Sequence, residues 1–425
     1  MSNTRISRSA GVATLALALL CVAAPAQASL DPVLKPYLAK YEIPALAAAV
    51  VKDGRIVAAG AVGTRRWGEN IPVTPSDRFH LGSDTKAMTA TLAAILVDQG
   101  KLRWDSTVGD VFPDLGENAD PVFTRLTLEQ LLSHTSGLPS DNLSRDAVPY
   151  MALTEVSDDW PVGNLDEIRA WLVRRWAALP MPGKPGGTFE YSNLNYVIVG
   201  AMIERLEGKT WDELIFDRIF RPLNLRTAGL GTQSTPGRTD APLPHAVVNG
   251  KIKPLLAGPL SDNPAVIGPA GIAHMSVLDF ARWAGWNAGE GKRGPALVKP
   301  ETLKRLHTAV VTIPPPADAP VGTPAGGKYA LGWGERVRDF HPDPILCHSG
   351  SNGMNIAQVH LDPKADFAVV LLANIAGKKA NEALDELVRE LFEAWAAKPA
   401  PPAPRSAATE PPKEKPEGKK PADGK

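Results

Sequence analysis

The stretch Phe79-His80-Leu81-Gly82-Ser83-Asp84-Thr85-Lys86 decides how this chain is interpreted, and an apolar run, 87–97, follows it. A helix that opens at Ser83 places Lys86 one turn later on the same face, so a hydroxyl has an amine within reach. No other Ser-x-x-Lys occurs in the sequence. About one match is expected by chance in a chain this long, so the pattern also fits a plain helix start with a solvated lysine.

The helix expected from Ser83 to about Gln99 favours the first of these interpretations. It is apolar nearly all round, with many alanines beside Met88, Leu92 and Ile95. A helix without a polar face is buried, and burial disfavours a solvated Lys86.

Composition limits the classes of function. The chain has 425 residues, no formal net charge and 44% hydrophobic residues, which suits one large domain or two lobes. A neutral chain argues against nucleic acid as a partner, because phosphate binding needs a basic face. The cysteines are Cys21 and Cys347, too few for a zinc set or a disulfide framework. We expect no metal and no cofactor.

Residues 1–28 have the pattern of a signal peptide. Arg5 and Arg8 precede an apolar run, 10–24, and Ala26-Gln27-Ala28 is a small-x-small cleavage site. The run of about fifteen residues is too short to span a bilayer. We therefore expect cleavage after Ala28, no stable membrane span, and a periplasmic or secreted protein.

Strand patterns stand at both ends of the chain, with helices between them. Asp53-Gly54 between apolar runs predicts a hairpin of 45–51 with 55–61. Period-two patterns predict further strands at 328–337, 345–349, 355–361 and 367–375, and an apolar stripe predicts a helix at 384–395. Helices are expected at 126–133, 166–178, 194–206, 210–220, 276–287 and 299–308.

These patterns predict an α/β fold of the α+β type. One antiparallel sheet is built from both chain ends and flanked by helices, and the middle of the chain forms an inserted, mostly helical lobe. We expect one domain at 29–397. Residues 398–425 are rich in Pro, Lys, Ala and Glu without an apolar pattern, which predicts a disordered tail.

Two further short motifs bear on Ser83. Tyr191-Ser192-Asn193 leads into an apolar helix, and His348-Ser349-Gly350 lies on an expected strand. With Ser83-x-x-Lys86, they resemble the active-site motifs of the serine β-lactamase and penicillin-binding protein superfamily. The match is best in the branch of class C β-lactamases, D-aminopeptidases and esterases. It covers about 29–397 and includes the flanks 131–138 and 271–279.

The resemblance implies a serine hydrolase. A serine hydroxyl needs a base, and Lys86 can serve only if burial lowers its pKa enough to make it neutral. Tyr191 would then shuttle the proton between Ser83, Lys86 and the leaving group. In the family two backbone N–H groups hold the oxyanion, here those of Ser83 and Ser351.

The remaining site residues would bind substrate. Asn193 would bond the substrate amide or the lysine, and Gly350 would let the substrate lie close to the strand that also carries Ser349. β-Lactamases and DD-peptidases usually carry lysine where this chain has His348, and that lysine helps to bind a carboxylate. An imidazole is only partly charged at neutral pH, which shifts the expectation toward esters or amides of D-amino acids and peptides.

Several alternatives stay open. The protein could be a β-lactamase or a D-alanyl-D-alanine carboxypeptidase, or a penicillin-binding sensor that is acylated without turnover. Ser140-Asp141-Asn142 and Ser261-Asp262-Asn263 match a motif of another branch, although Pro/Gly-rich surroundings favour turns there. Cys347 is expected to be a buried thiol that points away from the His348 side. The expected partner is a small-molecule or peptide substrate, and the oligomeric state is open.

Overall fold

A computed structural model describes residues 27–140, 163–256, 258, 261–315 and 326–396. The expected tail, all but the last two residues of the expected signal peptide, and Asp141 with Asn142 lie outside these ranges. Among the described residues, no helix is both long and apolar enough to cross a membrane.

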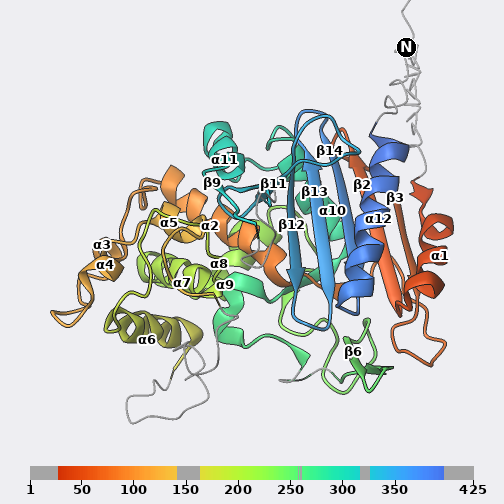
Figure 1. The fold of residues 1–425 in the computed structure, drawn as a ribbon, viewed down its shortest axis with the longest axis horizontal. Coiled ribbons are helices and arrows are strands. Elements are labelled where there is room, and N and C mark those ends of the chain that lie inside the picture. The colour runs from red at the N-terminus through yellow and green to blue at the C-terminus, as the bar shows by residue number, and fades with distance from the viewer. Residues whose placement is uncertain (1–26, 141–162, 257, 259–260, 316–325, 397–425) are drawn as a thin grey trace, which may run out of the picture.

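A nine-stranded sheet joins the two ends of the chain (Figure 1). Its order is β1 (Ala28–Ser29), β3 (Arg55–Gly63), β2 (Ala45–Lys52), β14 (Phe367–Ala373), β13 (Ile356–Asp362), β12 (Ile345–Ser351), β11 (Gly334–Arg336), β10 (Lys328–Tyr329) and β9 (Val311–Thr312). The predicted β2–β3 hairpin is confirmed, and β2 also pairs antiparallel with β14. Every pairing is antiparallel except that of β1 with β3, so the predicted fold class is confirmed.

Helices cover both faces of the sheet. Along β2, Leu46, Ala48 and Val50 pack in the cluster of α1 (Asp31–Tyr41) and α12 (Lys378–Trp395). The alternate residues of β2 pack in the cluster of α10 (Val277–Ala288). Side chains of a strand point alternately to its two faces, and β2 is apolar on both because both faces are covered.

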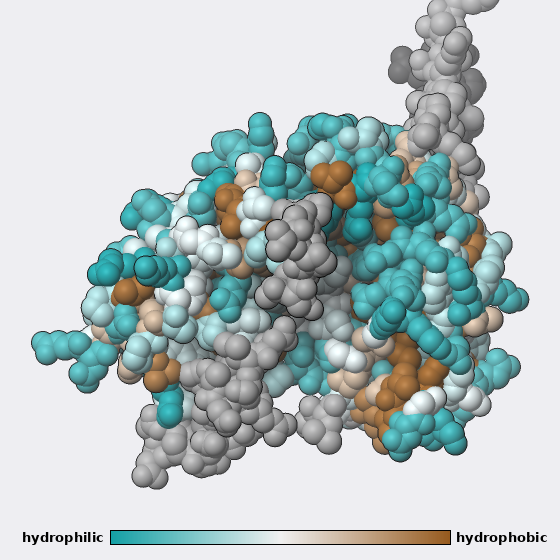
Figure 2. All heavy atoms as spheres, viewed as in Figure 1, coloured by the Kyte–Doolittle hydropathy of each residue, from teal (hydrophilic) through white to brown (hydrophobic). Residues whose placement is uncertain are grey.

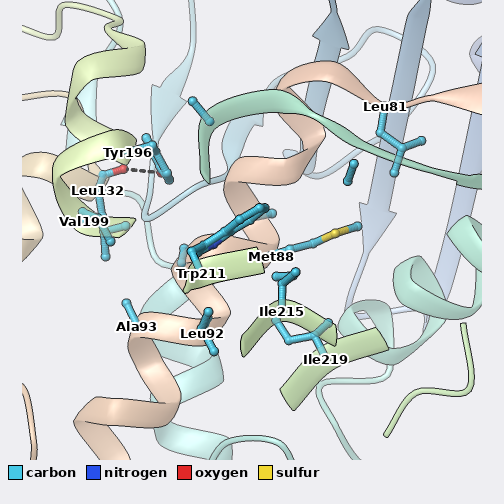
Figure 3. Packing of buried hydrophobic residues seen from close by; sticks show 14 of the residues in the cluster. Leu81, Met88, Leu92, Ala93, Leu132, Tyr196, Val199, Trp211, Ile215 and Ile219 are labelled. Atoms are coloured by element: carbon cyan, nitrogen blue, oxygen red, sulfur yellow. Dashed lines mark hydrogen bonds between the residues drawn. The ribbon is translucent and has the colours of Figure 1, made fainter. Parts of the chain in front are cut away.

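The middle of the chain forms the helical lobe (Figure 1). It contains α2 (Thr85–Asp98), α3 (Val108–Val111), α4 (Pro121–Thr124), α5 (Leu128–Leu132), α6 (Leu165–Ala177), α7 (Asn193–Glu207), α8 (Trp211–Ile215) with a π-helical turn (Phe216–Phe220), α9 (Gly268–Gly271) and α11 (Pro300–His307). Every residue of α2 from Thr85 to Leu96 is buried, as its composition predicts. Figure 3 shows Met88 and Leu92 of α2 beside Trp211 and Ile215 of α8.

Two predicted elements differ from the structure. The strand expected at 328–337 is two short strands, β10 and β11, which pair antiparallel with each other. The turn between them contains Gly332 with φ +86°, a conformation that favours glycine, and it packs on Ala87 and Ala90 of α2. The helix expected to open at Ser83 begins instead with a 3₁₀ turn, Gly82–Asp84.

The region 222–271, expected to be mostly irregular, contains several short elements. They are β5 (Gly229–Leu230), the hairpin of β6 (His245–Val248) with β7 (Lys251–Pro254), a 3₁₀ turn (Ala265–Ile267) and α9. β5 joins β4 (Arg78–His80) and β8 (Ala273–Ser276) in a small separate sheet. Figure 2 shows apolar surface near the β6–β7 hairpin, where the Val247 and Val248 side chains are exposed.

Candidate active site

Ser83 lies in the turn between the small sheet and the central helix α2. It is partly exposed, whereas its neighbours Gly82 and Asp84 are buried. Gly82 has φ +52° and donates its N–H to His80 Nδ1 at 3.0 Å. His80 Nε2 lies 2.7 Å from Asp262 Oδ1, so a buried His–Asp pair holds the turn that carries the serine.

Lys86 is fully buried one turn after Ser83. Its Nζ lies 3.0 Å from Ser83 Oγ, 2.5 Å from Asn193 Oδ1 and 2.8 Å from the Ala270 carbonyl oxygen. An ammonium has three protons to donate, and these three acceptors come from α2's own turn, α7 and α9. The lysine is therefore held beside the serine hydroxyl by groups from three segments of the chain.

Tyr191 lies against Lys86 and His134. The Lys86 Nζ is 4.7 Å from the centroid of the Tyr191 ring, and the His134 ring centroid is 4.3 Å from it. His134 has φ +59°, and its Nδ1 accepts the Ser192 N–H at 3.2 Å. Burial and the charge of Lys86 lower the pKa of His134 well below its usual value, so a neutral imidazole supports the Tyr191 motif.

Strand β12 approaches the serine turn so closely that no side chain fits between them. A Cβ on Gly350 would lie 1.8 Å from the Leu81 carbonyl oxygen and 2.6 Å from the Ser83 nitrogen. A Cβ on Gly82 would lie 2.3 Å from the Ser351 nitrogen. The backbone nitrogens of Ser83 and Ser351, the two predicted oxyanion donors, therefore lie on adjacent segments at one close approach.

The last four residues of β12 alternate between buried and exposed, after a buried first half. Ser349 and Ser351 are exposed, whereas His348 and Gly350 are buried against the turn of Ser83. The His348 side chain is only 5% exposed, with Nε2 3.0 Å from the Tyr329 hydroxyl. Burial, and then the positive charge of Lys86, lowers the pKa of His348 to about 3.

The structure thus brings Ser83, Lys86, Tyr191 and Asn193 together, with β12 residues 348–351 beside the serine turn. Sequence patterns missed Tyr329, which follows a glycine-rich segment and has no motif around it. His134 lies in the segment 131–138, which contributed to the family resemblance, but no pattern in the sequence assigned it a role.

The Ser261-Asp262-Asn263 segment supports the site instead of forming a mere turn. Asp262 pairs with His80, and Asn263 Nδ2 donates to the Gly271 carbonyl at 2.8 Å. Cys347 is buried, as predicted, and burial raises the pKa of its thiol.

Comparisons with known proteins show the family of the chain. A family model described as Beta-lactamase matches residues 30–393. The chain is 29% identical to Unguisins hydrolase ungD' of Aspergillus campestris over 85% of this chain and 64% of that protein. The chain thus spans slightly less than two thirds of the length of that relative.

Solved structures show the same fold. The octameric penicillin-binding protein homologue from Pyrococcus abyssi superposes with a TM-score of 0.64 and 26% identity, over 86% of this chain and 79% of that one. The D-amino acid amidase from Ochrobactrum anthropi SV3 gives a TM-score of 0.64 at 21% identity, over 86% of this chain and 98% of that one. Because the family model covers most of the sequence, the chain belongs to the beta-lactamase family of serine hydrolases.

Proposed function

We propose that the protein is an exported hydrolase that forms an acyl-enzyme on Ser83 and cleaves esters or amide bonds of D-amino-acid or peptide-like substrates. The observation that carries the proposal is the 3.0 Å contact between Lys86 Nζ and Ser83 Oγ in a buried site. A serine hydroxyl becomes a useful nucleophile only when a group within hydrogen-bond distance can take its proton.

The residues divide the reaction as follows. With Lys86 as a neutral amine, its Nζ accepts from the Ser83 hydroxyl across the 3.0 Å contact, and Ser83 Oγ attacks the substrate carbonyl while its proton passes to the Lys86–Tyr191 pair. The oxygen that becomes negative accepts hydrogen bonds from the N–H groups of Ser83 and Ser351. The proton then moves from the pair to the leaving alcohol or amine, which departs as the acyl-enzyme forms. Water attacks the ester on Ser83 by the same route and restores the serine.

Two observations support the substrate class. A D-amino acid amidase shares the fold, and a relative at 29% identity is named a hydrolase of unguisins. His348 is buried and uncharged, so it does not offer the cation that a substrate carboxylate would need. Esters and amides without a free carboxylate suit such a site best.

Ser83→Ala tests the proposal directly. We expect it to lower kcat/KM for a short-chain nitrophenyl ester by at least about 10³-fold, because the variant lacks the oxygen on which the proposed acyl-enzyme forms. It should also abolish the acyl adduct that intact-protein mass spectrometry detects on the wild-type chain. Ser140→Ala is the matched control, and it should retain both activity and adduct.

The other outcomes separate the alternatives. An adduct that survives in Ser83→Ala removes the proposed nucleophile, and a loss confined to Ser140→Ala moves the site to the 140–142 motif. A chromogenic cephalosporin turned over faster than the ester and a D-alanine amide would favour a β-lactamase. An adduct on Ser83 without turnover of any of the three substrates would favour a sensor.

A further inference from the structure

The residue after the serine carries an acid that the proposed mechanism does not use. Asp84 lies in the 3₁₀ turn and is 1% exposed. Its Oδ1 is 3.3 Å from His348 Nδ1, and among the described residues neither carboxyl oxygen has a hydrogen-bond partner. A buried carboxyl without neutralising donors is costly, so a role for this pairing is to be expected.

His348 connects Asp84 to Tyr329. In a neutral imidazole one ring nitrogen donates and the other accepts. Nε2 lies 3.0 Å from the Tyr329 hydroxyl, and Nδ1 faces Asp84 Oδ1 at 3.3 Å without a hydrogen bond between them. The three side chains come from η1 (Gly82–Asp84), β12 and β10, and η1 and β12 are the two segments that meet at the serine turn.

The surroundings keep this pair uncharged. Burial raises the pKa of Asp84 well above its usual value, and it lowers the pKa of His348 to about 3. The other ionisable groups that interact with these two side chains include Lys86 of α2, Arg336 of β11, Tyr329 of β10, Cys347 of β12 and His134 of the segment after α5. The Lys86 Nζ lies within hydrogen-bond distance of three other oxygen atoms, those of Ser83, Asn193 and Ala270, and none of them belongs to Asp84.

We propose that Asp84 and His348 act as one specificity-determining pair, which keeps this part of the site uncharged and selects acyl donors without a carboxylate. The proposal rests on the proposed acyl transfer at Ser83 and names its substrate class more narrowly. Asp84 follows Ser83 directly and His348 stands three residues before Ser351 on β12, so the pair adjoins both backbone nitrogens that would hold the acyl donor. A carboxylate there would lose water without gaining a cation.

Asp84 has a second consequence, because it would neutralise a cation placed at position 348. A lysine at that position would lie next to a buried acid, which favours the ionised carboxylate and a closed ion pair. A cation that substrates can use therefore requires two changes, one at each residue. This makes the two positions energetically coupled, which a double-mutant cycle can measure.

The experiment compares the wild type with Asp84→Asn, His348→Lys and the double variant. The substrates are 4-nitrophenyl butanoate and mono-4-nitrophenyl glutarate, which share a leaving group and differ by a carboxylate. The measured quantity is the ratio of kcat/KM for glutarate over butanoate. We expect each single variant to change the ratio by less than about threefold, and the double variant to raise it by about tenfold or more.

Each contrary result is decisive. If His348→Lys alone raises the ratio as much as the double variant does, Asp84 does not control the charge. If the double variant hydrolyses butanoate with an unchanged ratio, the pair does not read substrate charge. A failure of the proposed function looks different, because butanoate hydrolysis would then survive Ser83→Ala in every background.

A measurement on the wild-type protein covers the case in which a lysine variant does not fold. Histidine ring resonances in labelled protein, with His348 assigned by loss of its signals in His348→Gln, report the protonation state during a pH titration. We expect a neutral His348 ring from pH 8 down to about pH 5. Protonation of this ring above about pH 6 would overturn the proposal, because the site would then hold a cation near neutral pH.

Discussion

At the scale of single residues, the site depends on a missing side chain at Gly350. A Cβ at this position would overlap the Leu81 carbonyl oxygen, so Gly350→Ala must push β12 away from the serine turn. Donors displaced by about 1 Å cost about 10²-fold in rate, so we expect kcat/KM for a neutral ester to fall by at least that factor. Steady-state kinetics and thermal unfolding measure activity and stability separately.

Gly187→Ala is the matched control. This glycine has no positive φ, and a Cβ on it would meet nothing closer than 3.5 Å. It should keep wild-type kinetics. Equal activity of the two variants would mean that the approach of β12 to Ser83 is not required.

At the scale of elements, Arg169 of α6 ties the lobe together. Its fully buried guanidinium contacts Glu204 of α7 and lies 3.0 Å from Asp212 of α8. It also donates to the carbonyls of 265 and 266, which precede the α9 carbonyl that accepts from Lys86. Breaking a buried ion pair from one side costs about 3–5 kcal/mol, so we expect Arg169→Met to lower the free energy of unfolding by that amount.

Urea denaturation provides the measurement, and Arg174→Met provides the comparison on the same helix. Arg174 pairs with Asp114 at 3.2 Å, and its side chain is 44% exposed. Exposed pairs contribute about 0–1 kcal/mol because solvent screens them. Similar losses in both variants would show that the buried network is not what joins these helices.

At the scale of the whole molecule, buried histidines should make the fold sensitive to acid. Burial lowers the pKa of His245, His274 and His307 to about 4, and that of His360 to about 3. A depressed pKa in the folded state means that the unfolded chain binds more protons below the ordinary value of about 6.5. Stability is therefore full above that pH and is lost as the pH falls toward 4.

Free energies of unfolding measured by urea from pH 7.5 to pH 4 test this dependence. Each such histidine adds a slope of up to about 1.4 kcal/mol per pH unit inside the window. His360→Gln should reduce the pH dependence of the free energy of unfolding by the contribution of about one proton. Glutamine keeps a polar group near Gln358 but does not titrate. A flat profile, or an unchanged slope in this variant, would contradict the assignment.

Sequence patterns predicted the elements that depend on interactions between residues close together in the sequence. The β2–β3 hairpin follows from Asp53-Gly54 between apolar runs, and the buried α2 follows from a segment without a polar face. The Ser83–Lys86 contact follows from helical spacing, although the serine turn itself is 3₁₀. The motifs at 191–193 and 348–350 predicted which further segments would lie beside Ser83 and Lys86.

Long-range contacts could not be predicted in the same way. The split of 328–337 into β10 and β11 depends on a turn that packs on α2. The hydrogen bond of His348 with Tyr329, and the close contacts of His348 with Asp84 and of His80 with Asp262, join segments with no shared pattern. Their existence depends on which buried polar groups lose water together, and that is a property of the packed chain.

The stretch around Ser83 therefore determined by itself that Ser83 and Lys86 stand next to each other, because helical periodicity relates neighbouring residues. Only the tertiary structure decided the packing and the charge of the site around Ser83. It placed β12 against the serine turn through Gly82 and Gly350, and it buried His348 against Asp84. Burial sets the charge of a titratable side chain, and burial depends on neighbours that the chain brings from far away.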